Sequence, residues 1–310
     1  MLNIYKTLEE KLVEINEFEE KCWINLTNPT TKEIEKVATE LNVDIDFLKA
    51  PLDDEESSRI EIENDQIFIL VDIPVAEKEE GSYVYYTLPL GIILVGKYII
   101  TICLKENYII EQFIDNKIKS FYTYKRNRFL LQLLFRISSR YLIYLKQVDK
   151  MSSNIQRKLH KSMKNKELIQ LLDLEKSLVY FSTSLKANEI VLEKILKLEV
   201  VKLYPDDQDL LEDVIIENKQ AIEMATIYSN ILSGMMDAFA SVISNNLNIV
   251  MKILTSITII MAIPTMFASF FGMNVSLPMQ NSPYAFIAIV GTSIVFCLIT
   301  YVFLLKKNMF

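Results

Sequence analysis

The sequence predicts an α+β cytoplasmic domain with long stalk helices, followed by a two-helix transmembrane hairpin. Three observations carry this prediction. Strand-like runs separated by turn residues fill residues 1–108, and an apolar period of 3.6 residues, typical of helices, follows them. Finally, residues 253–305 contain no Asp, Glu, Lys, Arg or His, in a chain with 24% charged residues. An uncharged stretch of that length indicates membrane spans.

Charge is distributed unevenly along the chain. All 40 acidic residues and all but two of the 33 Lys and Arg residues precede residue 253, so this part carries a formal charge of −9. That balance disfavours nucleic acid as a partner and is compatible with cation binding. The N-terminus, MLNIYKTLEEKL, lacks the apolar core of a signal peptide, so we expect the large first part in the cytoplasm.

Few residues are available for metal or nucleophile chemistry. The chain has one histidine, His160, and three widely separated cysteines, Cys22, Cys103 and Cys297. This excludes a disulfide framework, a zinc ribbon and a His-based metal site within one subunit. The sequence has no glycine-rich phosphate loop, paired catalytic carboxylates or nucleophile elbow, so we do not expect an enzyme.

Residues 1–108 are predicted to form a sheet flanked by helices. Thr30 and Glu33 have the spacing of a capping box and open a predicted helix that runs to Leu41. A strand-like segment near Trp23 precedes this helix. Four runs rich in β-branched residues follow it, at Ser58–Ile62, Gln66–Ile73, Tyr83–Leu94 and Tyr98–Leu104.

Residues 109–204 are predicted to form long antiparallel helices. Apolar residues recur every three or four positions, as at Phe129 and Leu133. The sequence Lys164-Asn165-Lys166 predicts a turn, after which a second helix covers Leu168–Leu196. Packing of two such helices against each other is sufficient to explain this apolar stripe.

A third helix is predicted over residues 205–271. Pro205 suits the first helical turn, three aspartates follow it, and no further proline occurs before Pro264. At ~1.5 Å per residue, this helix would be on the order of 90 Å long. It would therefore leave the soluble domain and enter the membrane.

The uncharged stretch holds two candidate spans, residues 250–271 and 284–305, each near the ~20 residues needed to cross ~30 Å of hydrocarbon. The loop of residues 272–283 is short enough to make a hairpin with both outer ends on one side. Lysines flank the spans at Lys252 and, in a basic tail of residues 306–310, at Lys306 and Lys307. By the positive-inside rule this side is cytoplasmic. We expect a multi-pass protein of the cell membrane with both termini in the cytoplasm.

One face of the third helix carries mostly small or polar residues at steps of three or four. This stripe consists of Asp237, Ser241, Ser244, Asn248, Met251, Leu254, Thr258, Ala262, Thr265 and Ser269. Hydroxyl and carboxamide groups are costly in lipid, so the stripe should face other copies of the helix or water. Small residues also support close helix packing without a pore. In a ring of helices, Met251 and Leu254 would form an apolar constriction below a polar passage.

The end of the first predicted span carries a short motif. Gly272-Met273-Asn274 follows a span that contains a proline, and a short loop and a second span come after it. In this position the motif resembles that of the CorA family of magnesium channels. The resemblance extends to the cytoplasmic segments Trp23-Ile24-Asn25-Leu26, Leu52-Asp53-Asp54, Arg59-Ile60-Glu61 and Asp65-Gln66-Ile67-Phe68-Ile69.

The resemblance implies a homopentameric, funnel-shaped channel whose long helices continue as the inner ring of membrane spans. Family members conduct hydrated Mg²⁺, and many also pass Co²⁺ or Ni²⁺. Gly272, Met273 and Asn274 would form the selectivity filter, with five carboxamides touching the waters that Mg²⁺ releases reluctantly. By family position, the constriction would be Met251 and Leu254, and the pore lining would be Asn248, Thr258, Ala262, Thr265 and Ser269.

The resemblance also implies regulation by cytoplasmic Mg²⁺ bound between adjacent subunits. Asp65 and Asp213 stand at acidic positions of this sensor, and Asp237 is a further candidate. Asp65 also suits a turn, and Asp213 a solvated helix face, so the residue types alone leave both roles open. Asn64 stands at a family position for a second acid, which would weaken this sensor.

The sequence departs from the family pattern at two places and leaves two rival functions open. The loop Val275–Pro283 has no acid to recruit cations, and Phe271 stands where Tyr is frequent. One rival is transport of another divalent ion such as Zn²⁺, although zinc-transporting relatives generally depart from Gly-Met-Asn. The other is a membrane-tethered metal sensor without conduction, which would not need the polar stripe.

Overall fold

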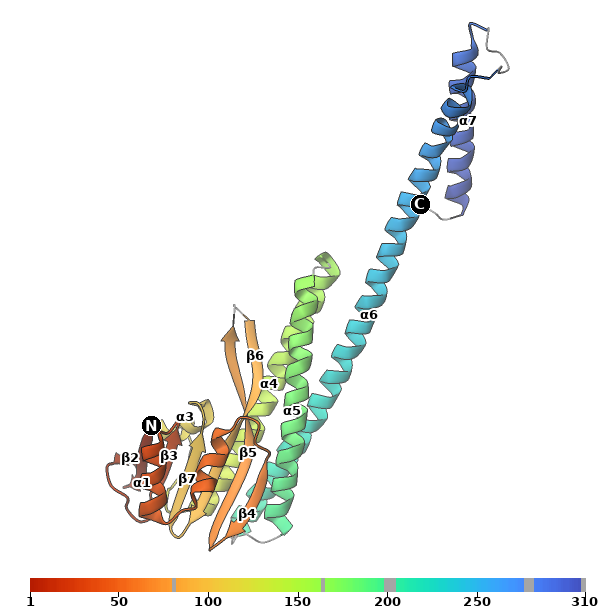
Figure 1. Ribbon diagram of the computed structural model, residues 1–310. Coiled ribbons are helices and arrows are strands. Elements are labelled where there is room, and N and C mark those ends of the chain that lie inside the picture. Colours follow the sequence, from red (N-terminus) through yellow and green to blue (C-terminus); the bar gives the residue numbers. More distant parts are fainter. Residues whose placement is uncertain (80–81, 163–164, 198–204, 276–281, 308–310) are drawn as a thin grey trace. The chain divides into compact units, whose positions relative to one another are not determined.

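The computed structural model describes the whole chain except residues 80–81, 163–164, 198–204, 276–281 and 308–310 (Figure 1). The chain divides into two compact units, Met1–Gly234 and Met235–Phe310. The division falls inside one long helix, α6, which spans Pro205–Phe271.

A seven-stranded sheet organises the described part of the first unit, in the order β2-β1-β3-β7-β6-β5-β4. Neighbouring strands are antiparallel, except that β3 and β7 run parallel. The strands are β1 (Leu2–Leu8), β2 (Lys11–Ile15), β3 (Trp23–Thr27), β4 (Arg59–Glu63), β5 (Gln66–Glu79), β6 (Ser82–Val95) and β7 (Tyr98–Cys103). The two longest, β5 and β6, pair along their whole length.

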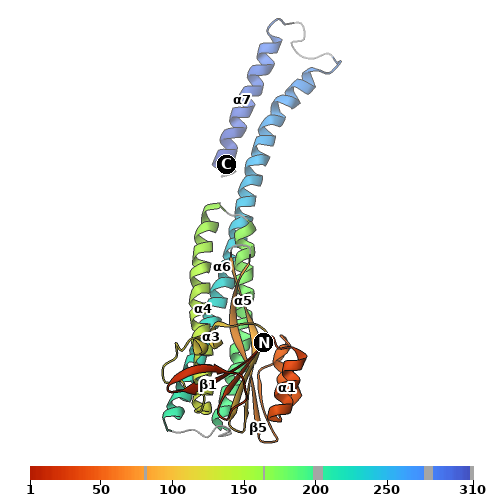
Figure 2. The same ribbon diagram turned by 90° about the vertical axis from the view of Figure 1, so that its left-hand side faces the viewer.

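Helices cover both faces of this sheet. Figure 2 shows α1 on one side of the strands and α4 and α5 on the other. The helices on the first face are α1 (Thr31–Leu41), α2 (Ile45–Lys49) and the short 3₁₀ helix η1 (Ala50–Leu52). Those on the second face are α3 (Tyr108–Ile114), α4 (Arg126–Ser162) and α5 (Asn165–Lys197).

The alternation of strand side chains produces these two faces. In β3, Ile24 packs in the cluster that also holds Ile34 and Val37 of α1. Trp23, the preceding residue, points to the other face, where its ring lies 5.1 Å from that of Phe129 and 6.4 Å from that of Phe113. One strand therefore contributes to two hydrophobic layers.

The helix α1 begins as the sequence predicts. The Glu33 N–H donates to Thr30 Oγ1 at 3.4 Å, and the Thr30 N–H donates to Glu33 Oε2 at 2.7 Å. This reciprocal pair satisfies two N–H groups that the first turn leaves without a helical partner. The helix ends at Asn42 in the left-handed conformation, as a C-cap commonly does.

On the second face, α4 and α5 bind the middle of β5 through polar contacts. Tyr141 Oη donates to the Asp72 carbonyl at 3.1 Å, and the Asn188 amide donates to the same carbonyl at 2.8 Å. The Asp72 N–H donates in turn to Asn188 Oδ1 at 2.9 Å. Because Tyr141 is fully buried, these bonds fix how α4 and α5 sit on the sheet.

Several predicted elements differ from the observed ones. The strands β1 and β2 and the helix α2 are absent from the prediction, and β5 extends to Glu79 rather than ending at Ile73. The helical region predicted from residue 109 begins with a short helix that ends at Ile114, and α4 starts only at Arg126. Asp207, one of the three aspartates predicted to complement the dipole of α6, also forms an ion pair with Arg128 at 3.1 Å.

Candidate functional site

The second unit is a pair of apolar helices. It contains the end of α6 and the helix α7 (Ala285–Lys306), and α7 packs against one face of α6. The Phe267 and Phe296 rings lie 5.4 Å apart, and Cys297 Sγ lies 3.6 Å from the Ile260 carbonyl oxygen. Both helices are long and apolar enough to cross a membrane.

The predicted polar stripe lies on the face of α6 opposite α7. At about 100° per residue, Ser256, Ile260 and Phe267 share the face toward α7. Six stripe residues are turned roughly half a circle from them and are exposed: Met251, Leu254, Thr258, Ala262, Thr265 and Ser269. Asn248 is also exposed but is turned only about 100° from that face. All of the predicted pore-lining side chains are therefore exposed in the single chain.

The hydroxyl groups of the stripe are oriented by the helix itself. Thr258 Oγ1 donates to the Leu254 carbonyl at 2.8 Å, and Thr265 Oγ1 donates to the Met261 carbonyl at 3.1 Å. Because the hydroxyl protons are already donated to backbone carbonyls, the Thr258 and Thr265 hydroxyl oxygens still have lone pairs that can accept further hydrogen bonds. A face of this kind suits a ligand that donates hydrogen bonds, such as a hydrated cation.

The Gly-Met-Asn motif follows the last turn of α6. The Gly272 N–H donates to the Ala268 carbonyl at 3.0 Å, and the Met273 N–H to that of Phe270 at 3.4 Å. Gly272 is not in the left-handed region, but a Cβ there would lie only 3.2 Å from the Ala268 oxygen. Asn274 is exposed. Within the predicted loop 272–283, residues 276–281 lie outside the described residues.

The three lysines predicted to mark the cytoplasmic side lie at helix surfaces. Lys252 lines a shallow cavity of about 340 Å³ on α6, together with Asn245, Asn248, Met251 and Thr255. Lys306 is the last residue of α7 and Lys307 is its C-cap. The remaining predicted tail, residues 308–310, lies outside the described residues.

The predicted sensor acids are exposed and lie on two separate segments of the chain. Asn64 and Asp65, with φ of 46° and 62°, form the tight turn between β4 and β5. Two positive φ angles are what a type I′ hairpin turn requires. Asp213 and Asp237 lie on exposed positions of α6. Among the residues that the structure describes, no group of three His, Cys, Asp or Glu residues could hold a metal ion.

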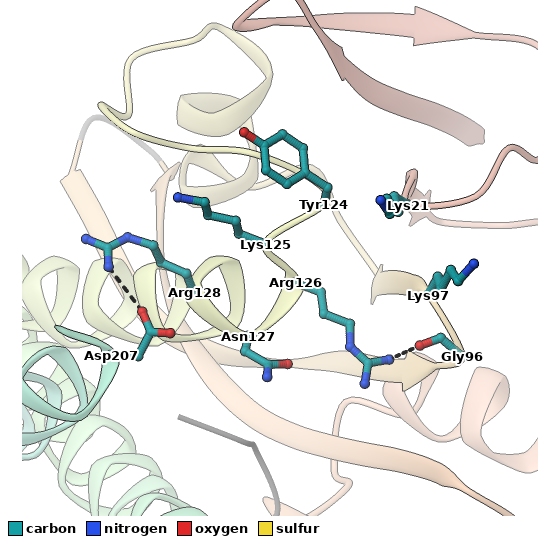
Figure 3. Close-up of a pocket in the computed structure, with 9 residues that line it drawn as sticks. All are labelled: Lys21, Gly96, Lys97, Tyr124, Lys125, Arg126, Asn127, Arg128 and Asp207. Atoms are coloured by element: carbon teal, nitrogen blue, oxygen red, sulfur yellow. Dashed lines mark hydrogen bonds and ion pairs between the residues drawn. The ribbon is translucent and has the colours of Figure 1, made fainter. Parts of the chain in front are cut away.

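A basic segment at the start of α4 has no counterpart in the predicted site. Lys125, Arg126 and Arg128 line a cavity of about 660 Å³ in the first unit, with Lys21 and Lys97 (Figure 3). A signal was present in the sequence, because Lys125-Arg126-Asn127-Arg128 places cations where the first turn of a helix favours acids.

Together, a soluble α/β unit and two apolar helices with a polar outer face define a membrane protein with two spans and a large soluble domain. The family described as CorA-like Mg²⁺ transporter protein matches residues 18–307. The chain therefore belongs to the CorA family.

Similar proteins cover nearly the whole chain. The cobalt/magnesium transport protein CorA of Methanocaldococcus jannaschii is 28% identical over 308 residues, which are 97% of this chain and 95% of that protein. The complete structure of the CorA magnesium transporter from the same organism matches with a TM-score of 0.81 and 25% identity, over 98% of this chain and 96% of that one.

A more distant structure shares the fold of the soluble part. The cytoplasmic domain of ZntB from Vibrio parahaemolyticus matches with a TM-score of 0.60 at 10% identity, over 79% of this chain and 97% of that one.

Proposed function

We propose that the chain assembles as a homopentamer in the cell membrane and takes up Mg²⁺ through a pore lined by α6, with Co²⁺ and Ni²⁺ as further permeant ions. The observation that carries this proposal is the exposed polar stripe on the face of α6 opposite α7. Support comes from the M. jannaschii relative, whose name states cobalt and magnesium transport. Both termini and residues 1–204 lie in the cytoplasm in this proposal.

The stripe provides a passage for a cation that keeps its water. Mg²⁺ loses its hydration shell reluctantly, so a pore for this ion should contact the waters rather than replace them. The acceptor oxygens of Thr258 and Thr265 can do this, since their protons are already bound to backbone carbonyls. Met251 and Leu254, which are 52% and 57% exposed in one chain, form the apolar constriction of the ring.

Asn274 is the proposed selecting residue, with Gly272 and Met273 completing the filter. A ring of neutral carboxamide oxygens accepts hydrogen bonds from the waters of Mg²⁺ without holding the ion as strongly as a carboxylate ring would. A Cβ at Gly272 would lie 3.2 Å from the Ala268 carbonyl oxygen, so glycine relieves a close contact at the first residue of the filter.

Flux into liposomes tests the filter. Asn274→Ala should reduce Mg²⁺ uptake by at least about a hundredfold, which corresponds to roughly 2.7 kcal/mol of lost stabilisation. Asn16→Ala is the matched control, because Asn16 is an exposed residue just after β2 and lies outside α6. This control should transport at the parental rate, and native mass spectrometry should count five subunits in both variants.

Three outcomes would refute parts of this function. Parental Mg²⁺ flux in Asn274→Ala would remove the filter assignment. Zn²⁺ flux without Mg²⁺ flux would favour transport of another divalent ion. Metal binding without any flux would favour a tethered sensor.

Regulation is proposed at Asp65 of one subunit and Asp213 of its neighbour, with Asp237 as a further ligand. Mg²⁺ between these carboxylates would offset their repulsion and favour the closed state, so a fall in cytoplasmic Mg²⁺ would open the pore. Because Asp65 also forms the β4–β5 turn, the test uses Asp65→Asn, which tolerates a positive φ, together with Asp213→Asn. This pair should lose Mg²⁺-dependent protection against protease, while Asp54→Asn with Asp209→Asn should keep it.

A further inference from the structure

One cavity of the first unit is basic, although that unit belongs to an acidic chain. It measures about 660 Å³, and its described lining includes five cationic side chains, Lys21, Lys97, Lys125, Arg126 and Arg128, against one carboxylate, Asp207. Figure 3 shows these side chains arranged around one space, with Lys21 and Lys97 on one side of it and Lys125 and Arg128 on the other. This size is within the ~300–1,000 Å³ typical of small-ligand sites.

Only part of this positive charge is neutralised by the described chain. Arg128 pairs with Asp207 at 3.1 Å, and Lys97 pairs with Glu20 at 2.7 Å. Arg126 donates to the Gly96 carbonyl, which carries no charge. Among the described residues, Lys21, Lys125 and Arg126 form no ion pair.

Arg126 is held in its position at an electrostatic cost. Partial burial lowers the pKa of its guanidinium, and no nearby carboxylate opposes that effect. Its hydrogen bond to Gly96 in the turn between β6 and β7 keeps the side chain at the cavity wall. An anion in the cavity would supply the missing countercharge.

The start of α4 adds to this field. The helix has 37 residues, and its first turn holds Arg126 and Arg128 but no acidic residue. Cations there oppose the positive end of the helix dipole, which favours anions. Residues that go against the local preferences of a helix are often functional, so cations at the start of α4 beside a cavity indicate a binding site.

We propose that this basic cavity binds a polyphosphate chain. Three cations of the described lining, Lys21, Lys125 and Arg126, form no ion pair among the described residues, which is more positive charge than one phosphate of about −2 would neutralise. Several linked phosphates match this charge better. Lysine ammonium and arginine guanidinium groups are the common protein ligands of phosphate. Because cations predominate among the described lining residues, recognition in this proposal rests on the phosphates.

Titration calorimetry on the full-length protein in detergent tests the proposal, in buffer freed of divalent metal so that phosphate chelation does not contribute. Inorganic tripolyphosphate and ATP should bind with similar affinity, and AMP and inorganic phosphate at least about tenfold more weakly. Binding should weaken as salt is raised, because screening reduces charge attraction.

Two sets of variants give effects of opposite sign. Lys21→Gln with Lys125→Gln removes two cations that form no described ion pair and should weaken tripolyphosphate binding at least about tenfold. Asp207→Asn removes a carboxylate of the described lining, frees Arg128 from its ion pair, and should tighten binding. The control Lys11→Gln with Lys32→Gln changes the net charge equally, at exposed positions outside the cavity, and should leave the affinity unchanged.

The proposal is overturned if tripolyphosphate does not bind, or if the Lys21/Lys125 variant binds it as the parent does. Equal losses in the Lys11/Lys32 control would show that net charge, rather than the cavity, attracts the ligand. Binding of ATP but not tripolyphosphate would show that the base is recognised and would also contradict the proposal.

Discussion

The two units of the chain place their apolar side chains in opposite ways. In the first unit, large side chains such as Trp23, Phe68 and Tyr141 are completely buried around the sheet. In the second unit, only 6% of the most apolar 18-residue stretch of α6 and 11% of that of α7 are buried. The first unit therefore contains its own core, whereas the second needs an apolar surrounding that one chain does not supply. Lipid and neighbouring copies of α6 provide it in the proposed pentamer.

The largest expected effect is the loss of an aromatic side chain from the first unit. Trp23 contacts the rings of Tyr5 and Phe129, each 5.1 Å away, and its Nε1–H donates to Thr101 at 2.8 Å. Trp23→Ala should cost about 3–5 kcal/mol of unfolding free energy, the usual range for Trp→Ala in a core.

Hydrogen exchange measured across the whole protein tests whether the two units depend on different surroundings. Exchange should rise in β3 and β7 of the Trp23→Ala variant and stay unchanged in α7, because the two units have separate cores. The control Tyr83→Ala removes an aromatic ring that is 51% exposed and should change stability by less than about 0.5 kcal/mol. Equal loosening of α7 in Trp23→Ala would contradict the distinction between the units.

The second prediction compares two faces of α6 within the second unit and rests on the proposed pore. Ala262 belongs to the stripe, whereas Ile257, which is 49% exposed, is turned about 140° from it around the helix axis. Ala262→Phe should reduce Mg²⁺ flux at least about tenfold by narrowing the passage, while Ile257→Phe should leave it nearly unchanged because an added ring is tolerated by lipid. Tracer flux into liposomes gives both values, and a stronger effect of Ile257→Phe would show that the stripe does not line the pore.

The sequence predicted the elements whose local signals agree with their surroundings. The capping box at Thr30 and the strands after Ser58 were found within a few residues, because turn residues and hydrophobic period point to the same structure there. The two long helices predicted after residue 109 were also found, as α4 and α5, while Lys164 of the predicted turn lies outside the described residues. The membership in the CorA family, predicted from Gly272-Met273-Asn274 and its context, is confirmed.

The missed elements depend on contacts distant in sequence. β1 and β2 are short and interrupted by polar or charged residues, such as Lys6 in β1 and Glu14 in β2, so their local apolar pattern is weak. β1 is fixed in the sheet by pairing with β3, some 20 residues later. The basic cavity joins Lys21, Lys97 and Arg126 from three separate segments, so no single motif reveals it. The filter, pore lining and sensor residues stay predictions, because their function depends on neighbouring subunits and on ions.

The smallest expected effect concerns a carboxyl group at the interface of the sheet with α4 and α5. Asp72 lies in β5 under α5, and burial raises the pKa of its side chain, while hydrogen bonds from Ser184 and Ser58 act in the opposite direction. The neighbouring titratable group on α4 is the Tyr141 hydroxyl, whose pKa is also raised by burial. The folded state therefore favours the protonated form of Asp72 more than the unfolded chain does.

The sign of the pH effect follows from that shift. Because the pKa of Asp72 is raised in the folded state, its contribution to the free energy of unfolding is fully present at pH values below its ordinary pKa of 3.8. This contribution is lost as the pH rises through the pKa that Asp72 has in the folded protein. Asp72→Asn keeps a neutral polar group, so it should raise the melting temperature at pH 7 by a few degrees and leave it nearly unchanged at the acid end of that window. Asp54→Asn, at an exposed position, should show no such pH-dependent gain. Calorimetric melting of the full chain at a series of pH values measures the difference, and equal curves for Asp72→Asn and the parent would show that this buried carboxyl does not contribute to the stability of the first unit.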